Sequence, residues 1–113
     1  MKISTKSQRK EFKNGNFCTA YEYPIGDKSI NGAVIELTGR YPEKGLAQNL
    51  VCKEMAYVVD GGGKVVVEGV EYSVNEGDVV LIDPGEKFYW EGDMELFMPC
   101  APAWDPAQYR TIE

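Results

Sequence analysis

The sequence predicts an all-β protein built as one double-sheet barrel of the jelly-roll type. Short runs rich in Val, Ile and Tyr recur along the chain, and each of them is too short for a helix. Segments rich in Gly, Asn and Asp separate these runs at close spacing, as is typical of turns between strands. With 113 residues, of which 43% are hydrophobic, the chain is large enough for a single domain with its own core.

Residues 1–16 are expected to form a basic N-terminal arm. Five Lys or Arg residues against Glu11 give residues 1–13 a charge of +4, so the other hundred residues carry −10 of the total of −6. Ser4 and Thr5 are candidate N-caps, so a short helix and an extended segment are both compatible with this stretch. We expect the arm to be solvated rather than bound to an acidic neighbour.

Two strands are predicted after the arm. Residues 17–23 show the two-residue alternation of a strand. Residues 29–38 form the second strand, in which Ala33, Ile35 and Leu37 share a wholly apolar face. We expect that face to point inward.

The middle of the chain carries the densest strand and turn signals. Residues 48–53 are expected to form a strand with Gln48, Leu50 and Cys52 on one face. Further short strands are predicted at residues 55–59, 64–67, 71–74 and 79–82. The turns between them are predicted at residues 60–63, 68–69 and 75–78, where glycine is frequent. The Asp-Gly-Gly-Gly sequence of the first turn predicts a hairpin.

The last strands of the barrel are predicted at residues 88–90 and 94–100, with a turn at residues 91–93. The barrel thus spans residues 17–100. Residues 101–113 begin with Pro102 and Trp104 and are expected to form a tail that packs on the barrel or on a partner subunit.

Two spaced motifs in this region point to a known family. Glu54 is followed after six residues by Gly61, and later Gly77-Asp78 precedes an apolar run and Pro84-Gly85. This pattern resembles the two characteristic motifs of the cupin superfamily, and most closely small single-domain bacterial cupins of unassigned function. The resemblance implies a jelly-roll barrel and a homodimer.

The metal ligands of that family are missing from this chain, which contains no histidine. The two first-motif His positions fall on Gln48 and Leu50, or in the neighbouring alignment on Ala47 and Asn49. The first alignment implies that the strand face with Gln48, Leu50 and Cys52 looks into the barrel. Phe88 stands at the third His position, and only Glu54 survives. One carboxylate does not hold a divalent transition metal, so we expect no metal site and no cofactor.

The candidate functional residues are Gln48, Glu54, Phe88 and Trp90. Glu54 in an apolar barrel is expected to have a raised pKa and is the candidate general acid or base. If the barrel is open, the other three residues complete a mostly apolar ligand pocket with a few polar groups. If it is filled, Phe88 and its apolar neighbours occupy the space instead, and size alone does not decide between the two.

The three cysteines are odd in number and form no CxxC pair. This pattern fits reduced thiols better than a disulfide framework. Since no His is present to activate Cys52 or Cys100, we interpret them as buried, unreactive thiols.

Composition also limits the partners and the compartment. The net charge of −6 argues against nucleic acid as a partner, because neutralising phosphates requires a basic surface. No apolar run is long enough to span a bilayer, and the polar N-terminus does not resemble a signal peptide, so we expect a cytoplasmic protein without a membrane partner.

Three functions fit these observations. The leading hypothesis is metal-independent binding of a small molecule, either a sugar or a small carboxylate. The second is an isomerase, epimerase or lyase that uses Glu54 with a tyrosine such as Tyr57 or Tyr89. The third is a non-catalytic dimerisation or interaction domain with a filled barrel.

Overall fold

The computed structural model describes residues 1–113 and confirms the all-β fold. Nine strands and two single-turn 3-10 helices make up the regular structure. The strands are β1 (Lys10–Lys13), β2 (Cys18–Glu22), β3 (Asn31–Tyr41), β4 (Leu46–Asn49), β5 (Lys53–Val67), β6 (Val70–Asn75), β7 (Val79–Ile82), β8 (Lys87–Ala101) and β9 (Tyr109–Ile112). The 3-10 turns are η1 (Lys6–Gln8) and η2 (Pro106–Gln108).

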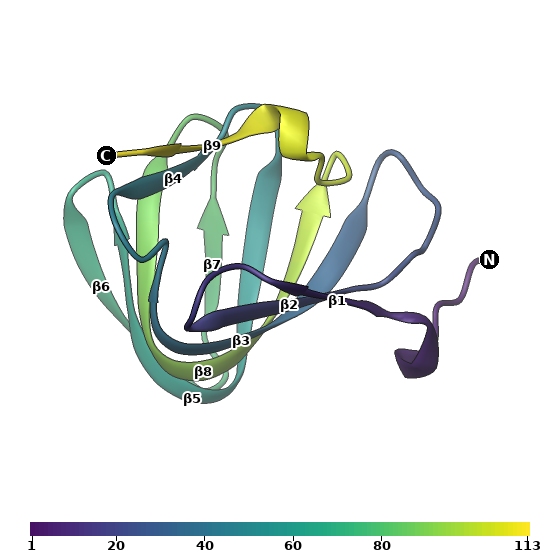
Figure 1. The fold of residues 1–113 in the computed structure, drawn as a ribbon, viewed down its shortest axis with the longest axis horizontal. Helices are drawn as coiled ribbons and strands as arrows, with labels where there is room; N and C mark the ends of the chain where they lie inside the picture. The colour runs from purple at the N-terminus through teal and green to yellow at the C-terminus, as the bar shows by residue number, and fades with distance from the viewer.

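The nine strands form one continuous antiparallel sheet that folds over on itself. The long strands β5 and β8 pair with each other and run through both halves, curving at the base of the molecule together with β3 (Figure 1). In one half, β1, β2 and β3 lie on one side of them and β7 on the other. In the other half, β9 and β4 lie beside the start of β8, and β6 beside the end of β5. The two halves face each other and enclose the interior of the jelly roll.

Glycines allow the two long strands to bend together, and this corrects two predicted turns. The turns predicted at residues 60–63 and 91–93 are wrong, since both stretches continue the strands, with Gly63 opposite Gly92. A Cβ on Gly63 would lie 2.2 Å from the Glu91 carbonyl oxygen, and one on Gly61 would lie 2.1 Å from that of Asp93. Glycine at these positions therefore permits a backbone approach at the fold line that no other residue allows.

The turn predicted at residues 68–69 is confirmed. Val67 pairs with Val70, so Glu68 and Gly69 form a two-residue hairpin loop. Both have positive φ, 49° and 79°, as the twist-compatible two-residue hairpin turn requires.

Alternation along the strands builds a core between the two halves of the sheet. Along β8 every second side chain from Phe88 to Trp90 and from Met94 to Cys100 is buried. Leu37 of β3 belongs to this core and Ile35 packs against it, as predicted. Leu50 does not, because β4 ends at Asn49 and the side chain of Leu50 is 46% exposed. The predicted inward face of residues 48–53 is therefore interrupted at Leu50, while Gln48 and Cys52 are buried.

Both chain ends add strands to the sheet beyond the predicted limits of 17–100. Within the predicted arm, β1 pairs with β2 along its whole length. Within the predicted tail, β9 pairs with β4, so the tail packs on its own barrel. Neither 3-10 turn, at three residues, has the length that crossing a membrane demands.

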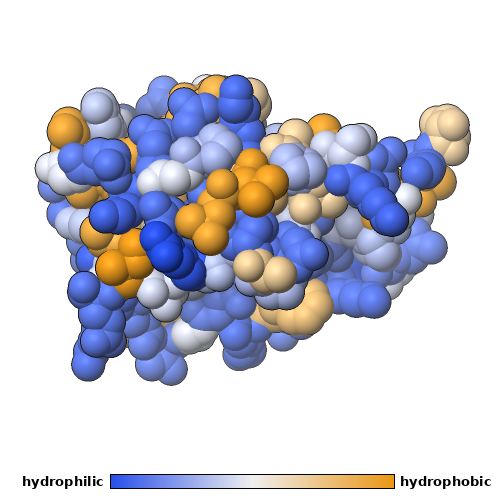
Figure 2. All heavy atoms as spheres, turned by 90° about the horizontal axis from the view of Figure 1, so that it is seen from above, coloured by the Kyte–Doolittle hydropathy of each residue, from blue (hydrophilic) through white to orange (hydrophobic).

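The outer face of β5, β7 and β8 carries exposed apolar side chains, including Met55, Tyr57, Leu81 and Phe97. Seen from the side of β4 and β9, the surface shows smaller apolar patches among hydrophilic residues (Figure 2). The homodimer stays a prediction.

Candidate functional site

A cavity of about 420 Å³ opens between the two halves of the barrel. Twenty residues line it, and fourteen of them are hydrophobic. This volume falls within the range of small-molecule pockets, which runs from roughly 300 to 1,000 Å³. The barrel is therefore open, and the structure gives no support to the filled-barrel alternative.

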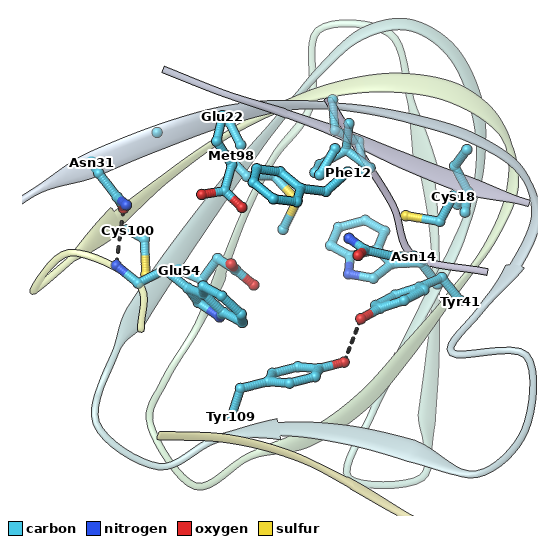
Figure 3. A pocket seen from close by; sticks show the side chains of 18 of the residues that line it. Phe12, Asn14, Cys18, Glu22, Asn31, Tyr41, Glu54, Met98, Cys100 and Tyr109 are labelled. Carbon is cyan, nitrogen blue, oxygen red and sulfur yellow. Dashed lines mark hydrogen bonds between the residues drawn. The ribbon is translucent and has the colours of Figure 1, made fainter. Parts of the chain in front are cut away.

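Glu54 projects into this cavity from β5 (Figure 3). It sits between β7 and β8, where its Cα pairs with those of Ile82 and Cys100. Its side chain is shielded from bulk solvent by the cavity walls, and this burial raises the pKa of its carboxyl from 4.5 to about 7. A hydrogen bond from Asn49 Nδ2 to Glu54 Oε1, at 3.4 Å, acts in the opposite direction. Glu54 can therefore both release and accept a proton near neutral pH.

Asn49, behind Glu54, is held by the C-terminal segment. Its Oδ1 accepts hydrogen bonds from Trp104 Nε1 at 3.2 Å and from Gln108 Nε2 at 2.9 Å. Gln108 Oε1 in turn accepts from the backbone N–H groups of Val51 and Cys52. The segment expected to be a tail thus reaches the candidate catalytic group through one buried side chain.

Two tyrosines that the sequence did not single out share a hydrogen bond in the cavity wall. Tyr41 of β3 and Tyr109 of β9 have their hydroxyl oxygens 2.5 Å apart (Figure 3). Burial raises the pKa of both hydroxyls, so both are neutral at physiological pH. One hydroxyl donates to the other, which leaves the second hydrogen free to donate to a ligand.

These are not the tyrosines that the sequence suggested as partners of Glu54. Tyr57 is 44% exposed on the outer face. The Arg40 guanidinium stacks over the Tyr89 ring, with its central carbon 3.8 Å from the ring centroid, and Tyr89 does not line the cavity. Tyr41 and Tyr109 are 68 residues apart in the sequence, so no local motif could have linked them.

The remaining predicted site residues fall in two places. Phe88 and Trp90 line the cavity with Glu54. Gln48 does not, since its amide donates to the Gly85 carbonyl and its Oε1 accepts from Arg110 Nε, both at 2.6 Å. Ligand binding by these residues stays a prediction.

Trp90 has an unusual feature for a buried side chain. Only 3% of the residue is exposed, and its indole Nε1 has no hydrogen-bond partner. Leaving a buried donor unsatisfied costs about 1–3 kcal/mol, so such a group is expected to serve a purpose.

The N-terminal part of the chain, which the sequence did not indicate as part of the site, also lines the cavity. Phe12 of β1, Asn14, Glu22 of β2 and Asn31 of β3 all contribute to the lining (Figure 3). Glu22 and Glu54 are the only charged residues in the lining, and no Lys or Arg takes part.

The residues of the cavity do not fit the metal of the fold family. No three His, Cys, Asp or Glu side chains gather in a way that could hold an ion. Of the family's ligand positions, Gln48 is engaged elsewhere, Leu50 is exposed and Phe88 is apolar. In the neighbouring alignment Ala47 is apolar and the Asn49 oxygen already accepts two hydrogen bonds. Metal independence itself stays a prediction.

The three cysteines are free and buried, as the sequence suggested. Burial raises the pKa of Cys18, in the cavity wall, to about 12 and raises that of Cys100 as well. Both thiols are therefore protonated and poor nucleophiles at neutral pH.

Comparisons with known proteins agree with this architecture. The family model described as Cupin domain matches residues 51–98, and no curated protein matches the sequence. Pac13, described as a nucleoside dehydratase, superposes with a TM-score of 0.90 at 18% identity, covering 98% of this chain and 90% of its own. Variants of Streptomyces PAC13 with uridine superpose equally well.

Two further structures share the fold. An RmlC-like cupin from Shewanella frigidimarina gives a TM-score of 0.77 at 18% identity, covering 93% of this chain and 94% of its own. KdgF from Halomonas sp. gives 0.75 at 13% identity, covering 93% and 96%. The shared barrel shows that this chain has the cupin fold, and the match of the Cupin domain model to residues 51–98 agrees with that fold.

Proposed function

We propose that this protein is a small lyase-type enzyme that removes water from a neutral, hydroxylated ring compound bound in the barrel. The observation that carries the proposal is the position of the Glu54 carboxyl, which faces the cavity between the two halves of the barrel, where burial raises its pKa to about 7. A group with this pKa serves equally well as general base and as general acid near neutral pH.

The chemistry needs one proton acceptor and one proton donor. Ionised Glu54 takes a proton from a carbon next to an electron-withdrawing group such as a carbonyl. The electron pair of that C–H bond forms a C=C double bond, and the hydroxyl on the neighbouring carbon leaves. Glu54 then returns the proton to the departing hydroxyl, so that hydrogen and hydroxyl leave together as water. The free hydrogen of the Tyr41–Tyr109 pair can donate to an oxygen of the substrate.

The charges of the cavity define the class of ligand. Glu22 and Glu54 line it and no cationic side chain does, so a phosphate or carboxylate group would meet no compensating charge. Of the two ligand classes that the sequence suggested, this favours a sugar-like compound over a small carboxylate. Aromatic walls, including Trp90 and Trp104, suit a planar or cyclic body.

Two further observations support a ligand with oxygen acceptors. Trp90 belongs to the cavity wall and its buried N–H has no partner within the protein, so a small shift of the indole on binding would let it donate to a carbonyl or hydroxyl oxygen. The fold shared with Pac13 supports nucleosides as the first compounds to try, since that protein is described as a nucleoside dehydratase and its variants were solved with uridine.

The test is a turnover screen of neutral nucleosides and sugars, including forms oxidised to a carbonyl, followed by mass spectrometry for loss of water. Wild type should convert at least one class, and Glu54→Gln should abolish turnover while binding survives. Glu76→Gln, in an exposed turn, is the matched control and should retain activity. Conversion that persists in Glu54→Gln would refute the role of Glu54.

A binding protein without turnover is the second candidate, and the preformed cavity with its apolar walls favours it. It predicts thermal stabilisation by a neutral compound without any product. Glu54→Gln would then change affinity only modestly.

A further inference from the structure

We infer that Asn49 is a positioning residue that directs a hydrogen-bond donor at the Glu54 carboxylate and so sets the pH range in which Glu54 exchanges its proton. The inference rests on the proposed role of Glu54 and adds to it a residue outside the cavity. Asn49 is 2% exposed and does not line the cavity, so it can act on a ligand only through Glu54.

The orientation of the Asn49 amide follows from a chain of hydrogen bonds that begins at the backbone. The N–H groups of Val51 and Cys52 both donate to one oxygen of Gln108, at 3.1 and 3.2 Å. That oxygen must therefore be the carbonyl oxygen, and the Gln108 NH₂ group is left to face Asn49.

The second half of the chain fixes Asn49 itself. Its oxygen accepts from the Gln108 NH₂ group and from the indole N–H of Trp104, which can only donate. The Asn49 NH₂ group then has one direction left, and it points at Glu54 Oε1. Two donors from the C-terminal segment thus decide which end of Asn49 faces Glu54.

A donor at this place favours the ionised carboxylate. No positively charged donor faces Glu54 from the other elements around it. The titratable groups there are the Cys100 thiol on β8, the Tyr41 and Tyr109 hydroxyls and the Glu22 carboxylate across the cavity. The hydrogen bond from Asn49 counteracts desolvation and lowers the pKa of Glu54, so that a larger fraction of Glu54 is ionised near neutral pH.

The C-terminal segment thereby becomes part of the site. Trp104 is anchored by its backbone N–H, which donates to Asn31 Oδ1 at 3.0 Å, and Gln108 is buried. Their hydrogen bonds act on Glu54 through Asn49.

The test measures the titration midpoint of Glu54 by NMR of the isotope-labelled glutamate carboxyl, assigned by its absence in Glu54→Gln. Wild type should titrate near the pKa of about 7 given by the structure. Asn49→Leu should raise the midpoint by about one pH unit, as expected for loss of one hydrogen bond to a charged group. Gln48→Met is the matched control, since it removes a neighbouring buried amide of β4 that does not contact Glu54, and it should leave the midpoint unchanged.

Trp104→Phe keeps an aromatic ring and removes the indole donor to Asn49, so it tests the same chain if Asn49→Leu does not fold. It should raise the midpoint by a smaller amount. An unchanged midpoint in the folded Asn49 or Trp104 variant, or an equal rise in Gln48→Met, would overturn the inference. Because this titration needs no substrate, it can fail while the Glu54→Gln turnover test succeeds, and the reverse also holds.

Discussion

Replacing Glu54 with Gln should stabilise the protein at alkaline pH and leave its stability nearly unchanged at acid pH. Burial raises the pKa of Glu54 from 4.5 to about 7 in the folded state. Between these values the folded protein binds the proton and the unfolded chain has lost it, so the free energy of unfolding falls as pH rises through this range. The stabilising contribution of the protonated carboxyl is complete below 4.5 and is lost above about 7.

The magnitude follows from the two pKa values. Their difference corresponds to about 3 kcal/mol, which is the extra free energy needed to ionise Glu54 in the folded protein compared with the unfolded chain. Glutamine has nearly the same shape as the protonated side chain and cannot ionise. At about pH 8 the variant should therefore be more stable than wild type by up to about 3 kcal/mol, and at about pH 4 the two should agree within roughly 0.5 kcal/mol.

Urea unfolding of both proteins across this pH range measures the difference directly. Glu76→Gln, in an exposed turn, should show no comparable dependence on pH and is the control for removal of a negative charge from an acidic protein. A constant difference between wild type and Glu54→Gln at all pH values would show that Glu54 is not desolvated, and the proposed acid–base role would lose its basis.

Three further predictions follow from single contacts. Tyr109→Phe should destabilise the protein by about 1 kcal/mol through loss of the hydrogen bond to Tyr41, and a double-mutant cycle with Tyr41→Phe should show the coupling in urea unfolding. Gly63→Ala should lower the free energy of unfolding by about 3 kcal/mol or more, because its Cβ would lie 2.2 Å from the Glu91 carbonyl oxygen. A Gly63→Ala variant with wild-type stability in urea unfolding would contradict the role of glycine in the bend. Trp90→Phe should weaken uridine binding by about tenfold in calorimetry by removing the unpartnered donor, and equal affinity would rule out that contact.

The sequence predicted the fold well where the signals are local. The loop at Glu68 and Gly69, the strand at residues 79–82 and the inward face of β3 all follow from alternation and turn chemistry, and each is confirmed. The glycines at residues 61–63 were mistaken for a turn because glycine marks both chain reversal and close backbone approach. Only the pairing of β5 with β8 distinguishes the two.

The site could be predicted only in part. Glu54, Phe88 and Trp90 were found through one strand pattern and one motif, and all three line the cavity. The inward position of Gln48 follows only from its match to a His position of the motif, whereas its amide is engaged by the Gly85 carbonyl and Arg110 outside the cavity lining. Tyr109 and the Asn49 network were missed because they depend on β9 folding back onto β4, a contact between segments about 60 residues apart that no local pattern records.

The central claim, that the cavity beside Glu54 receives a neutral ring compound, is tested most directly by titrating uridine into isotope-labelled protein. The chain has two tryptophans, so its spectrum contains two indole N–H signals, and both residues line the cavity. We predict that uridine shifts both signals and that uridine monophosphate, which carries an anionic group, does so far more weakly. Signals that stay unchanged with uridine and with every other neutral nucleoside and sugar, or that respond equally to the monophosphate, would contradict the account.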